Sequence, residues 1–197
     1  MLSNQLFSRF TAPLILLSLI LLHIGLALTY NDGHFVYALD DPYIHLDLAD
    51  MLYQHGLYGV NMREYAAPSS SILWPFLLVP FFILGSIAVY APFILALASS
   101  CAAVMVIEAL AKRLSPQLKN NHRLILVCLA AMTINLPAMP LMGMEHATQI
   151  LLVLLTVLGT LEALEGDAPP RWLWLVLIIS PLIRYENLFP SLGALGI

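Results

Sequence analysis

The chain has 197 residues, of which 60% are hydrophobic and only 10% are charged, whereas about a quarter of the residues in an ordinary soluble domain are charged. A soluble fold could not cover this much apolar surface, and long apolar runs at 14–28, 72–111 and 150–161 predict helices in lipid. The net charge of −4 comes without any Lys/Arg cluster, so nucleic-acid binding has no support.

The first predicted membrane span covers residues 13 to 30. One basic residue, Arg9, precedes an apolar stretch from Ala12 to Leu28. This stretch is longer than the roughly 7 to 15 apolar residues of a signal-peptide core. We therefore expect an uncleaved first span whose amino terminus lies in the cytoplasm.

An acidic outer loop is predicted at residues 31 to 71. It holds a single arginine, Arg63, against six acidic residues, which are Asp32, Asp40, Asp41, Asp47, Asp50 and Glu64. Within it, Asp41-Pro42 predicts a helix start, with Asp41 as the N-cap of a helix from Tyr43 to about His55.

This helix is predicted to be amphipathic and to lie along the membrane surface. One face carries Ile44, Leu48, Met51 and Leu52, while polar residues occupy the other face. Capping alone would account for Asp41. Asp40 is not needed for the cap and is therefore the freer carboxylate.

The apolar segment at residues 72 to 88 is interrupted by Pro75 and Pro80, and Gly85 with Pro92 separates it from the apolar run that follows. The most basic connector of the chain, residues 112 to 123, is expected in the cytoplasm together with the amino terminus. An even number of crossings must then lie between them, so 72 to 88 is interpreted as a re-entrant or interfacial helix. A full crossing by this segment is the alternative, and it would reverse the side of every later loop.

The remaining predicted spans are 91 to 111, 124 to 140, 146 to 163 and 172 to 190. The expected fold is thus an all-α membrane protein, a single module of about five transmembrane helices. Cys101 and Cys128 lie inside apolar runs and are interpreted as inert small residues. In this arrangement the polar clusters around Asp40, Glu145 and Arg184 meet at the outer membrane face.

Two of these clusters interrupt apolar sequence and are candidates for chemistry. Glu145 lies between two apolar segments, where it either caps the next helix or acts in a site. Arg184 and Glu186 either form a simple ion pair or face a polar cavity, where the forked guanidinium donor suits a phosphate.

Several short motifs follow one another in a characteristic order and spacing. They are Asp40-Asp41-Pro42-Tyr43-Ile44-His45, Ala49-Asp50, the run from Ala67 to Pro75, Gly143-Met144-Glu145 and Arg184-Tyr185-Glu186. Together they resemble the amino-terminal module of GT-C glycosyltransferases, most closely bacterial relatives of the terminal arabinofuranosyltransferases of mycobacterial cell walls. The resemblance covers nearly all of the chain from about Phe35 onward.

The resemblance implies a GT-C-like helical bundle in the bacterial inner membrane that moves a sugar from a polyprenyl-phosphate donor to a glycan, lipid or protein acceptor. It assigns catalytic roles to Asp40, Asp41 and Glu145, with Asp40 as the general base. Arg184 and Glu186 match a motif more often written Arg-Pro-Glu-Gly, from which Tyr185 and Asn187 depart. Members of the family usually have more spans, so we expect this chain to be the front of a longer architecture.

The chemistry of sugar transfer requires a base for the acceptor hydroxyl and a group that holds the departing phosphate. Arg184, helped by His146 or Tyr185, is the predicted phosphate-binding group. No cofactor is expected, and no strong metal cluster is present, although Asp40, Asp41 and Glu145 could together admit a divalent ion.

Two other kinds of protein share these features. A transporter or flippase of a lipid-linked precursor would also bury charges, but near the membrane midplane and with an internal repeat, which the sequence lacks. A non-catalytic accessory subunit or fragment is the third alternative.

Overall fold

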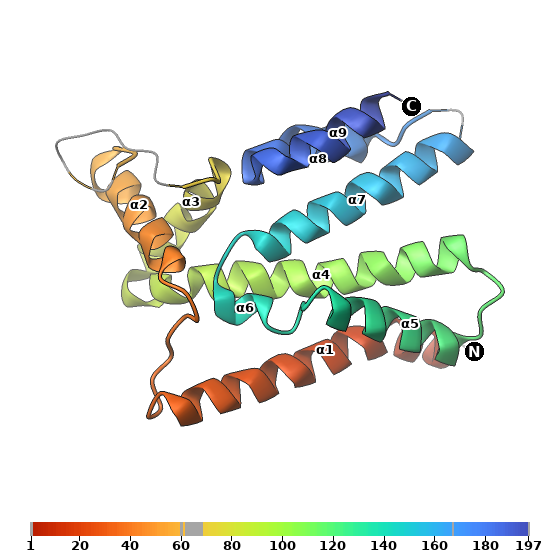
Figure 1. Ribbon diagram of the computed structural model, residues 1–197, viewed down its shortest axis with the longest axis horizontal. Coiled ribbons are helices and arrows are strands. Elements are labelled where there is room, and N and C mark those ends of the chain that lie inside the picture. Colours follow the sequence, from red (N-terminus) through yellow and green to blue (C-terminus); the bar gives the residue numbers. More distant parts are fainter. Residues whose placement is uncertain (1, 60, 62–68, 167, 197) are drawn as a thin grey trace.

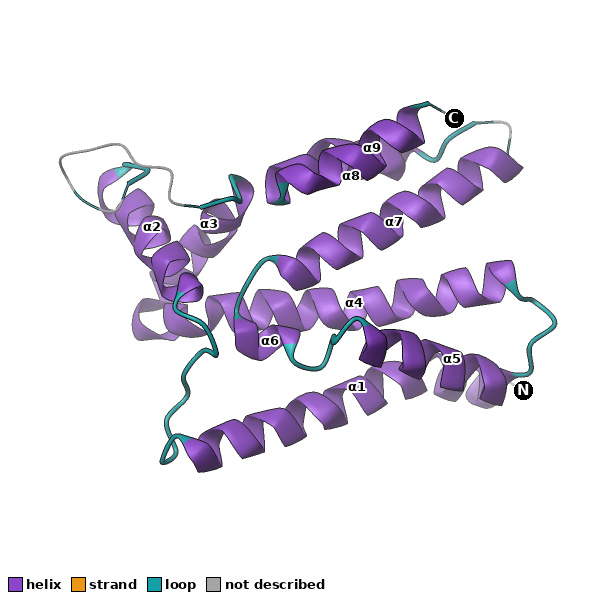
Figure 2. Ribbon diagram, in the orientation of Figure 1, coloured by secondary structure: helices purple, strands orange, loops and turns teal. Residues whose placement is uncertain are grey.

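The computed structural model describes residues 2–59, 61, 69–166 and 168–196, and the regular structure within these residues is entirely helical (Figures 1 and 2). Three helical segments are long and apolar enough to cross a membrane, namely Phe10–Tyr30, Leu73–Leu114 and His146–Glu165. The protein is therefore a helical membrane protein. Four residues used in the sequence analysis lie outside the described part of the chain: Arg63, Glu64, Ala67 and Pro68.

The long helix α4 (Ala91–Leu114) lies at the centre of the bundle, between α1 (Leu2–Tyr30) and α7 (His146–Glu165) (Figure 1). The end of the bundle at which α1 ends and α4 and α7 begin is here named the polar end. The opposite end carries the basic connector between α4 and α5 and is named the basic end.

The core between α1, α4 and α5 is built from aliphatic side chains. Ile20, Val104 and Val127 are at most 1% exposed, and alanines such as Ala103 allow the helices to approach closely. Burying a side chain of the Val/Leu/Ile class contributes about 1.5 to 3 kcal/mol in water, but in lipid the gain comes from close packing instead.

The predicted span at 124 to 140 is wrong in its extent. Helix α5 covers Asn120–Thr133 and stops there, because Asn135 adopts the left-handed conformation (φ 57°) and Pro137 and Pro140 follow. A short helix, α6 (Met139–Met142), then turns the chain toward α7. Fourteen residues rise only about 21 Å, less than the roughly 30 Å of a hydrocarbon core.

The predicted span at 172 to 190 is also divided. Helix α8 (Arg171–Ile183) ends where Arg184 adopts an extended backbone, and the 3₁₀ turn η2 (Tyr185–Asn187) follows. Helix α9 (Leu188–Leu195) then returns alongside α8 (Figure 1). The polar run therefore forms a reversal of the chain at the polar end, and α8 alone is too short to span a bilayer core in an upright orientation.

Helix α2 (Asp41–His55) lies across the polar end (Figure 1). It begins at Asp41, and Asp40 holds the N-cap position, so the prediction of Asp41 as N-cap was wrong by one residue. The Asp40 side chain makes no capping hydrogen bond. Pro42 in the first turn needs no hydrogen-bond acceptor, which lets the helix start without a cap.

The buried face of α2 also differs from the predicted one. Leu48 is fully buried as expected, but Ile44 is 36% exposed, and His45 and Leu46 point inward instead. The face is rotated because α2 packs against α3 and η1 rather than only on lipid.

Helix α3 (Leu73–Leu78) and the 3₁₀ segment η1 (Val79–Tyr90) connect the loop after α2 to α4, and both lie at the polar end (Figure 1). The Ser71 hydroxyl accepts the backbone N–H of Trp74 at 3.1 Å and so caps the first turn of α3. Gly85, at φ 63° and ψ −128°, kinks η1, so 72 to 88 is not one straight helix.

Candidate functional site

Glu145 is the most deeply buried carboxylate of the site. It holds the N-cap position of α7, yet its side chain makes no capping hydrogen bond, so capping does not explain it. It follows Gly143, which ends α6 at φ 65°. A β-carbon at Gly143 would lie 2.5 Å from the Tyr37 ring, so only glycine allows this turn to approach the loop before α2.

Tyr37 fixes that loop to the bundle. Its hydroxyl donates to the Val89 carbonyl at 2.7 Å and accepts the Phe93 backbone N–H at 3.1 Å. The backbone N–H of Ala38 donates to Leu141 in α6 at 3.0 Å. Burial raises the pKa of the Tyr37 hydroxyl, which therefore stays neutral and can donate. These bonds set the position from which α2 begins.

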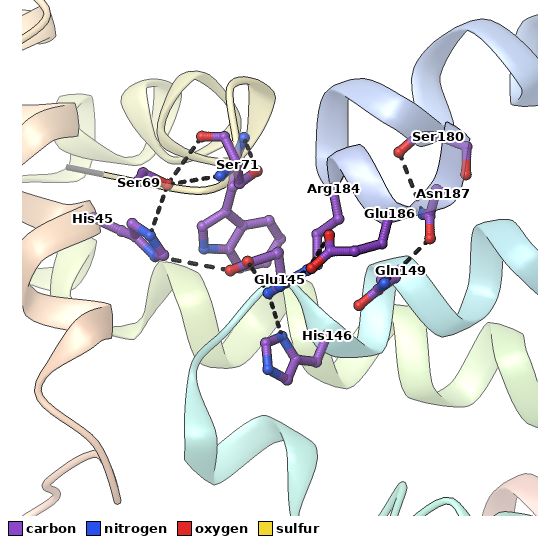
Figure 3. A network of polar contacts seen from close by, with 11 residues as sticks. His45, Ser69, Ser71, Glu145, His146, Gln149, Ser180, Arg184, Glu186 and Asn187 are labelled. Atoms are coloured by element: carbon purple, nitrogen blue, oxygen red, sulfur yellow. Dashed lines mark hydrogen bonds and ion pairs between the residues drawn. The ribbon is translucent and has the colours of Figure 1, made fainter. Parts of the chain in front are cut away.

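Arg184 pairs with two carboxylates at the polar end (Figure 3). Its Nη1 donates to Glu145 Oε1 at 2.9 Å, while Nε and Nη2 donate to the two Glu186 oxygens at 3.1 and 2.6 Å. The Arg184 side chain is 17% exposed, Glu145 is fully buried and Glu186 is 39% exposed. The bidentate hydrogen bond lowers the pKa of Glu186 and raises that of Arg184, so both are charged.

His45 extends this network, and the sequence analysis did not place it among the site residues. It is 4% exposed. Its Nε2 lies 3.0 Å from the Ser69 hydroxyl, and its Nδ1 lies 4.0 Å from Glu145 Oε2 (Figure 3). Desolvation by burial lowers the pKa of His45, although the Glu145 and Asp41 carboxylates oppose that shift, so the imidazole is neutral at pH 7.

Two buried atoms of this network have no hydrogen-bond partner: His45 Nδ1 and Glu145 Oε2, which face each other. A small open pocket with about 80 Å³ of free space adjoins His45. It is lined by Asp41, Ile44, His45, Ser69, Ser70 and Met144. Unpaired polar atoms are expensive to bury, and the pocket beside His45 makes these two a candidate place for binding a proton or a ligand.

The structure brings most of the predicted site residues together, but not all of them. Glu145, Arg184 and Glu186 are in direct contact, and His146 Nδ1 lies 3.5 Å from Arg184 Nη1, at the long limit of a hydrogen bond. Asp41 is exposed but lines the pocket beside His45.

Two predicted residues lie apart from the network. Tyr185 is 64% exposed. The Asp40 side chain is exposed as well, and within the described part of the chain it makes no side-chain hydrogen bond. Asp40 and Asp41 are neighbours in sequence, but the first turn of α2 directs only Asp41 toward the pocket.

A second polar set supports the reversal after α8. Asn187, 1% exposed, accepts from Gln149 Nε2 at 3.2 Å and donates to the Ser180 carbonyl at 3.3 Å (Figure 3). These bonds join α7 to the end of α8 and hold Arg184 above Glu145. Asn187 is thus a positioning residue in this chain.

The possibility of a divalent ion at Asp40, Asp41 and Glu145 finds no geometric support. Among the residues that the structure describes, no group of three His, Cys, Asp or Glu side chains is close enough to hold a metal ion. The buried carboxylate is already neutralised by Arg184.

The role of His45 could not be read from its surroundings in sequence. Its spacing from Leu48 and Ala49 places it on the buried face of α2, which is the only sequence signal available. Ser69 and Glu145, its partners, are 24 and 100 residues away along the chain, so only the tertiary structure brings the three together.

The chain was also compared with known proteins. No family model, no curated protein and no solved structure matches it.

Proposed function

We propose that this protein is a membrane glycosyltransferase of the GT-C type that moves a sugar from a polyprenyl-phosphate donor to a cell-envelope acceptor at the outer membrane face. The observation that carries the proposal is the buried network of Glu145, Arg184 and His45 beside a polar pocket at one end of the helical bundle. The resemblance of the motifs supports the same assignment.

The location of the charges favours an enzyme over a transporter. Carriers hold their substrates near the middle of the membrane between broken helices. Here the network gathers where α7 begins and α8 ends, at the boundary of the bundle, where a lipid-linked headgroup meets a water-soluble or membrane-bound acceptor.

Arg184 is the group proposed to receive the donor phosphate. Its Nε and Nη2 form the planar fork that binds a carboxylate or a phosphate equally well. Glu186 occupies this fork, but it is the more exposed of the two partners, at 39% against 0% for Glu145. An arriving phosphate replaces Glu186, while Glu145 keeps the guanidinium in place.

Asp41 is the proposed base for the acceptor hydroxyl. Both Asp40 and Asp41 fit the paired acidic motif, and the sequence-based hypothesis gave the role to Asp40. Asp41 is preferred because it lines the pocket beside His45. In the transfer, the acceptor oxygen bonds to the anomeric carbon of the sugar, and the bond from that carbon to the phosphate oxygen breaks. The Asp41 carboxylate takes the proton of the acceptor hydroxyl.

The orientation proposed is the one with the amino terminus in the cytoplasm of a bacterium and the polar end outside. The basic connector at the basic end supports it, because Lys and Arg are enriched in short cytoplasmic loops.

The test is sugar transfer by the full-length protein in native membranes, with a panel of radiolabelled undecaprenyl-phosphate pentoses and hexoses as donors. We expect transfer by the wild type, and a loss of 100-fold or more in Asp41→Asn, because removal of a general base typically costs about 10²- to 10⁴-fold. Asp32→Asn, in the same acidic segment but outside the pocket, is the matched control and should retain activity. Absence of transfer by the wild type from every donor would reject the proposal.

Asp40→Asn distinguishes the two carboxylates. If Asp40→Asn abolishes transfer while Asp41→Asn retains it, the base is Asp40 and the role given to Asp41 is wrong.

A further inference from the structure

A second feature of the same site concerns the fate of the proton. Three side chains form a continuous line from the pocket into the core: Ser69 Oγ, the His45 ring and the Glu145 carboxylate (Figure 3). Ser69 lines the pocket, His45 is 4% exposed and Glu145 is fully buried. The imidazole therefore stands between an accessible hydroxyl and a sequestered carboxylate.

The tautomer of His45 decides whether its surroundings are satisfied. If the ring hydrogen is on Nε2, the bare Nδ1 faces the Glu145 oxygen across 4.0 Å, and both remain unpaired acceptors. If the hydrogen is on Nδ1, it points at the carboxylate, and Nε2 accepts the Ser69 hydroxyl at 3.0 Å once that hydroxyl turns from the Ser71 carbonyl, to which it otherwise donates at 3.0 Å. Only the second arrangement places a donor opposite the Glu145 oxygen, so that a small shift of the ring would pair the two orphaned atoms.

The charged groups around His45 act in opposite directions on its protonation. Asp41 on its own helix and Glu145 at the start of α7 attract a proton, and His146 on α7 opposes it. Glu145 is already shared with Arg184, which weakens its pull on His45. The resting imidazole is neutral, and a proton that reaches it lies against a carboxylate that stabilises the imidazolium.

We propose that His45 is a further catalytic residue that takes up, through the Ser69 hydroxyl, the proton released by the acceptor. This inference rests on the proposed function. Asp41 takes the proton from the acceptor hydroxyl and passes it to Ser69 Oγ on the same pocket, while the Ser69 hydrogen passes to His45 Nε2. The acceptor oxygen bonds to the sugar carbon, and the electron pair of the broken bond stays on the phosphate.

This step balances the charge that the reaction creates. The donor is a phosphodiester with one negative charge, whereas the departing polyprenyl phosphate is a monoester with two negative charges. The proton on His45 supplies one positive charge to the network of Arg184, Glu145 and Glu186, whose own net charge is −1 from one guanidinium and two carboxylates. The new negative charge is thus compensated within the site until the products leave.

The kinetic test is the pH dependence of kcat for the full chain in membranes. In the wild type, kcat should fall as the pH drops through the pKa of His45, because a protonated imidazole cannot take up a proton. Burial lowers that pKa from its ordinary value of 6.5, so the acid limb lies below pH 6.5. His45→Gln should lose 100-fold or more in kcat together with this limb. His55→Gln, the same substitution on the exposed end of α2, should change neither.

Ser69→Ala tests the route of the proton. We expect kcat to fall about tenfold while the acid limb remains, because water replaces the hydroxyl less effectively. Retention of full kcat by Ser69→Ala, or retention of both kcat and the acid limb by His45→Gln, would overturn the proposal.

A measurement that needs no sugar transfer keeps the inference testable if the proposed function fails. ¹⁵N-histidine NMR of the full chain in nanodiscs, with His45→Gln as the assignment control, reports the ring tautomer directly. The proposal requires hydrogen on Nδ1 and a bare Nε2; the opposite tautomer overturns it. An inactive wild type would reject glycosyl transfer alone, whereas active wild type with a wrong tautomer would reject only the role of His45.

Discussion

Glu145 shows how a single buried charge organises its surroundings. An isolated carboxylate would not remain ionised without water, but Arg184 pairs with it at 2.9 Å. Removing one member of a buried ion pair leaves the charge of the other member unpaired. This lowers stability more than replacing both members by apolar residues does. The same arginine also pairs with Glu186, which solvent reaches.

This difference predicts unequal effects on stability. Glu145→Gln should lower the free energy of unfolding by on the order of 3 kcal/mol, because it leaves the guanidinium without its buried partner. Glu186→Gln should have a much smaller effect, since water replaces the lost carboxylate. Thermal or denaturant unfolding in detergent measures both.

The double variant Glu145→Gln/Arg184→Gln provides the control. It should recover part of the loss, because the only charge left without a partner is that of Glu186, which solvent reaches. Equal losses in Glu145→Gln and Glu186→Gln would show that burial does not set the strength of these pairs.

At the scale of elements, close approach between helices depends on small residues. Gly159 in α7 is one such position, since a β-carbon there would lie 2.8 Å from Leu173 Cδ1 and from a Trp172 ring carbon in α8. Helices in membranes associate through this kind of packing. The contact also holds α8 in place, and with it Arg184 at its end.

Gly159→Val should therefore move α8 away from α7 and destabilise the fold by about 1 to 3 kcal/mol. Gly25→Val in α1 is the matched control, because nothing lies within 4 Å of a β-carbon at Gly25 and the helix propensity changes equally. Detergent unfolding of the two variants isolates the packing term, and similar stabilities would contradict the predicted contact.

At the scale of the whole molecule, the arrangement of helices fixes which loops share a side of the membrane. Helix α1 ends at the polar end, α4 begins there, and α3 and η1 lie there as well (Figure 1). The loop before α2 and the reversal after α8 are then on one side, and the connector between α4 and α5 is on the other.

Single cysteines test this arrangement in a background with Cys101 and Cys128 replaced by serine. His34→Cys and Tyr185→Cys, both at exposed positions, should react with an impermeant maleimide added to intact cells, because the polar end faces outward in the proposed orientation. Gln117→Cys should react only after permeabilisation. Labelling of His34→Cys and Tyr185→Cys from opposite sides would contradict both the bundle and the shared site.

The sequence by itself determined that this is a helical membrane protein, because long apolar runs with few charged residues are stable in lipid and not in water. It also predicted α1, α4 and α7, whose apolar stretches are long and uninterrupted. It failed at α5 and at the α8–α9 reversal, because hydropathy does not register the left-handed Asn135 or the extended Arg184 that break those spans.

For the site, Glu145, Arg184 and Glu186 were visible in the sequence because charge is costly within apolar segments. Only the tertiary structure decided that they touch one another, that Asp41 rather than Asp40 lines the pocket, and that His45 joins them. The physical reason is the direction of each side chain. The packing of α2 against α3 sets the rotation of its faces, and that packing depends on residues far away along the chain.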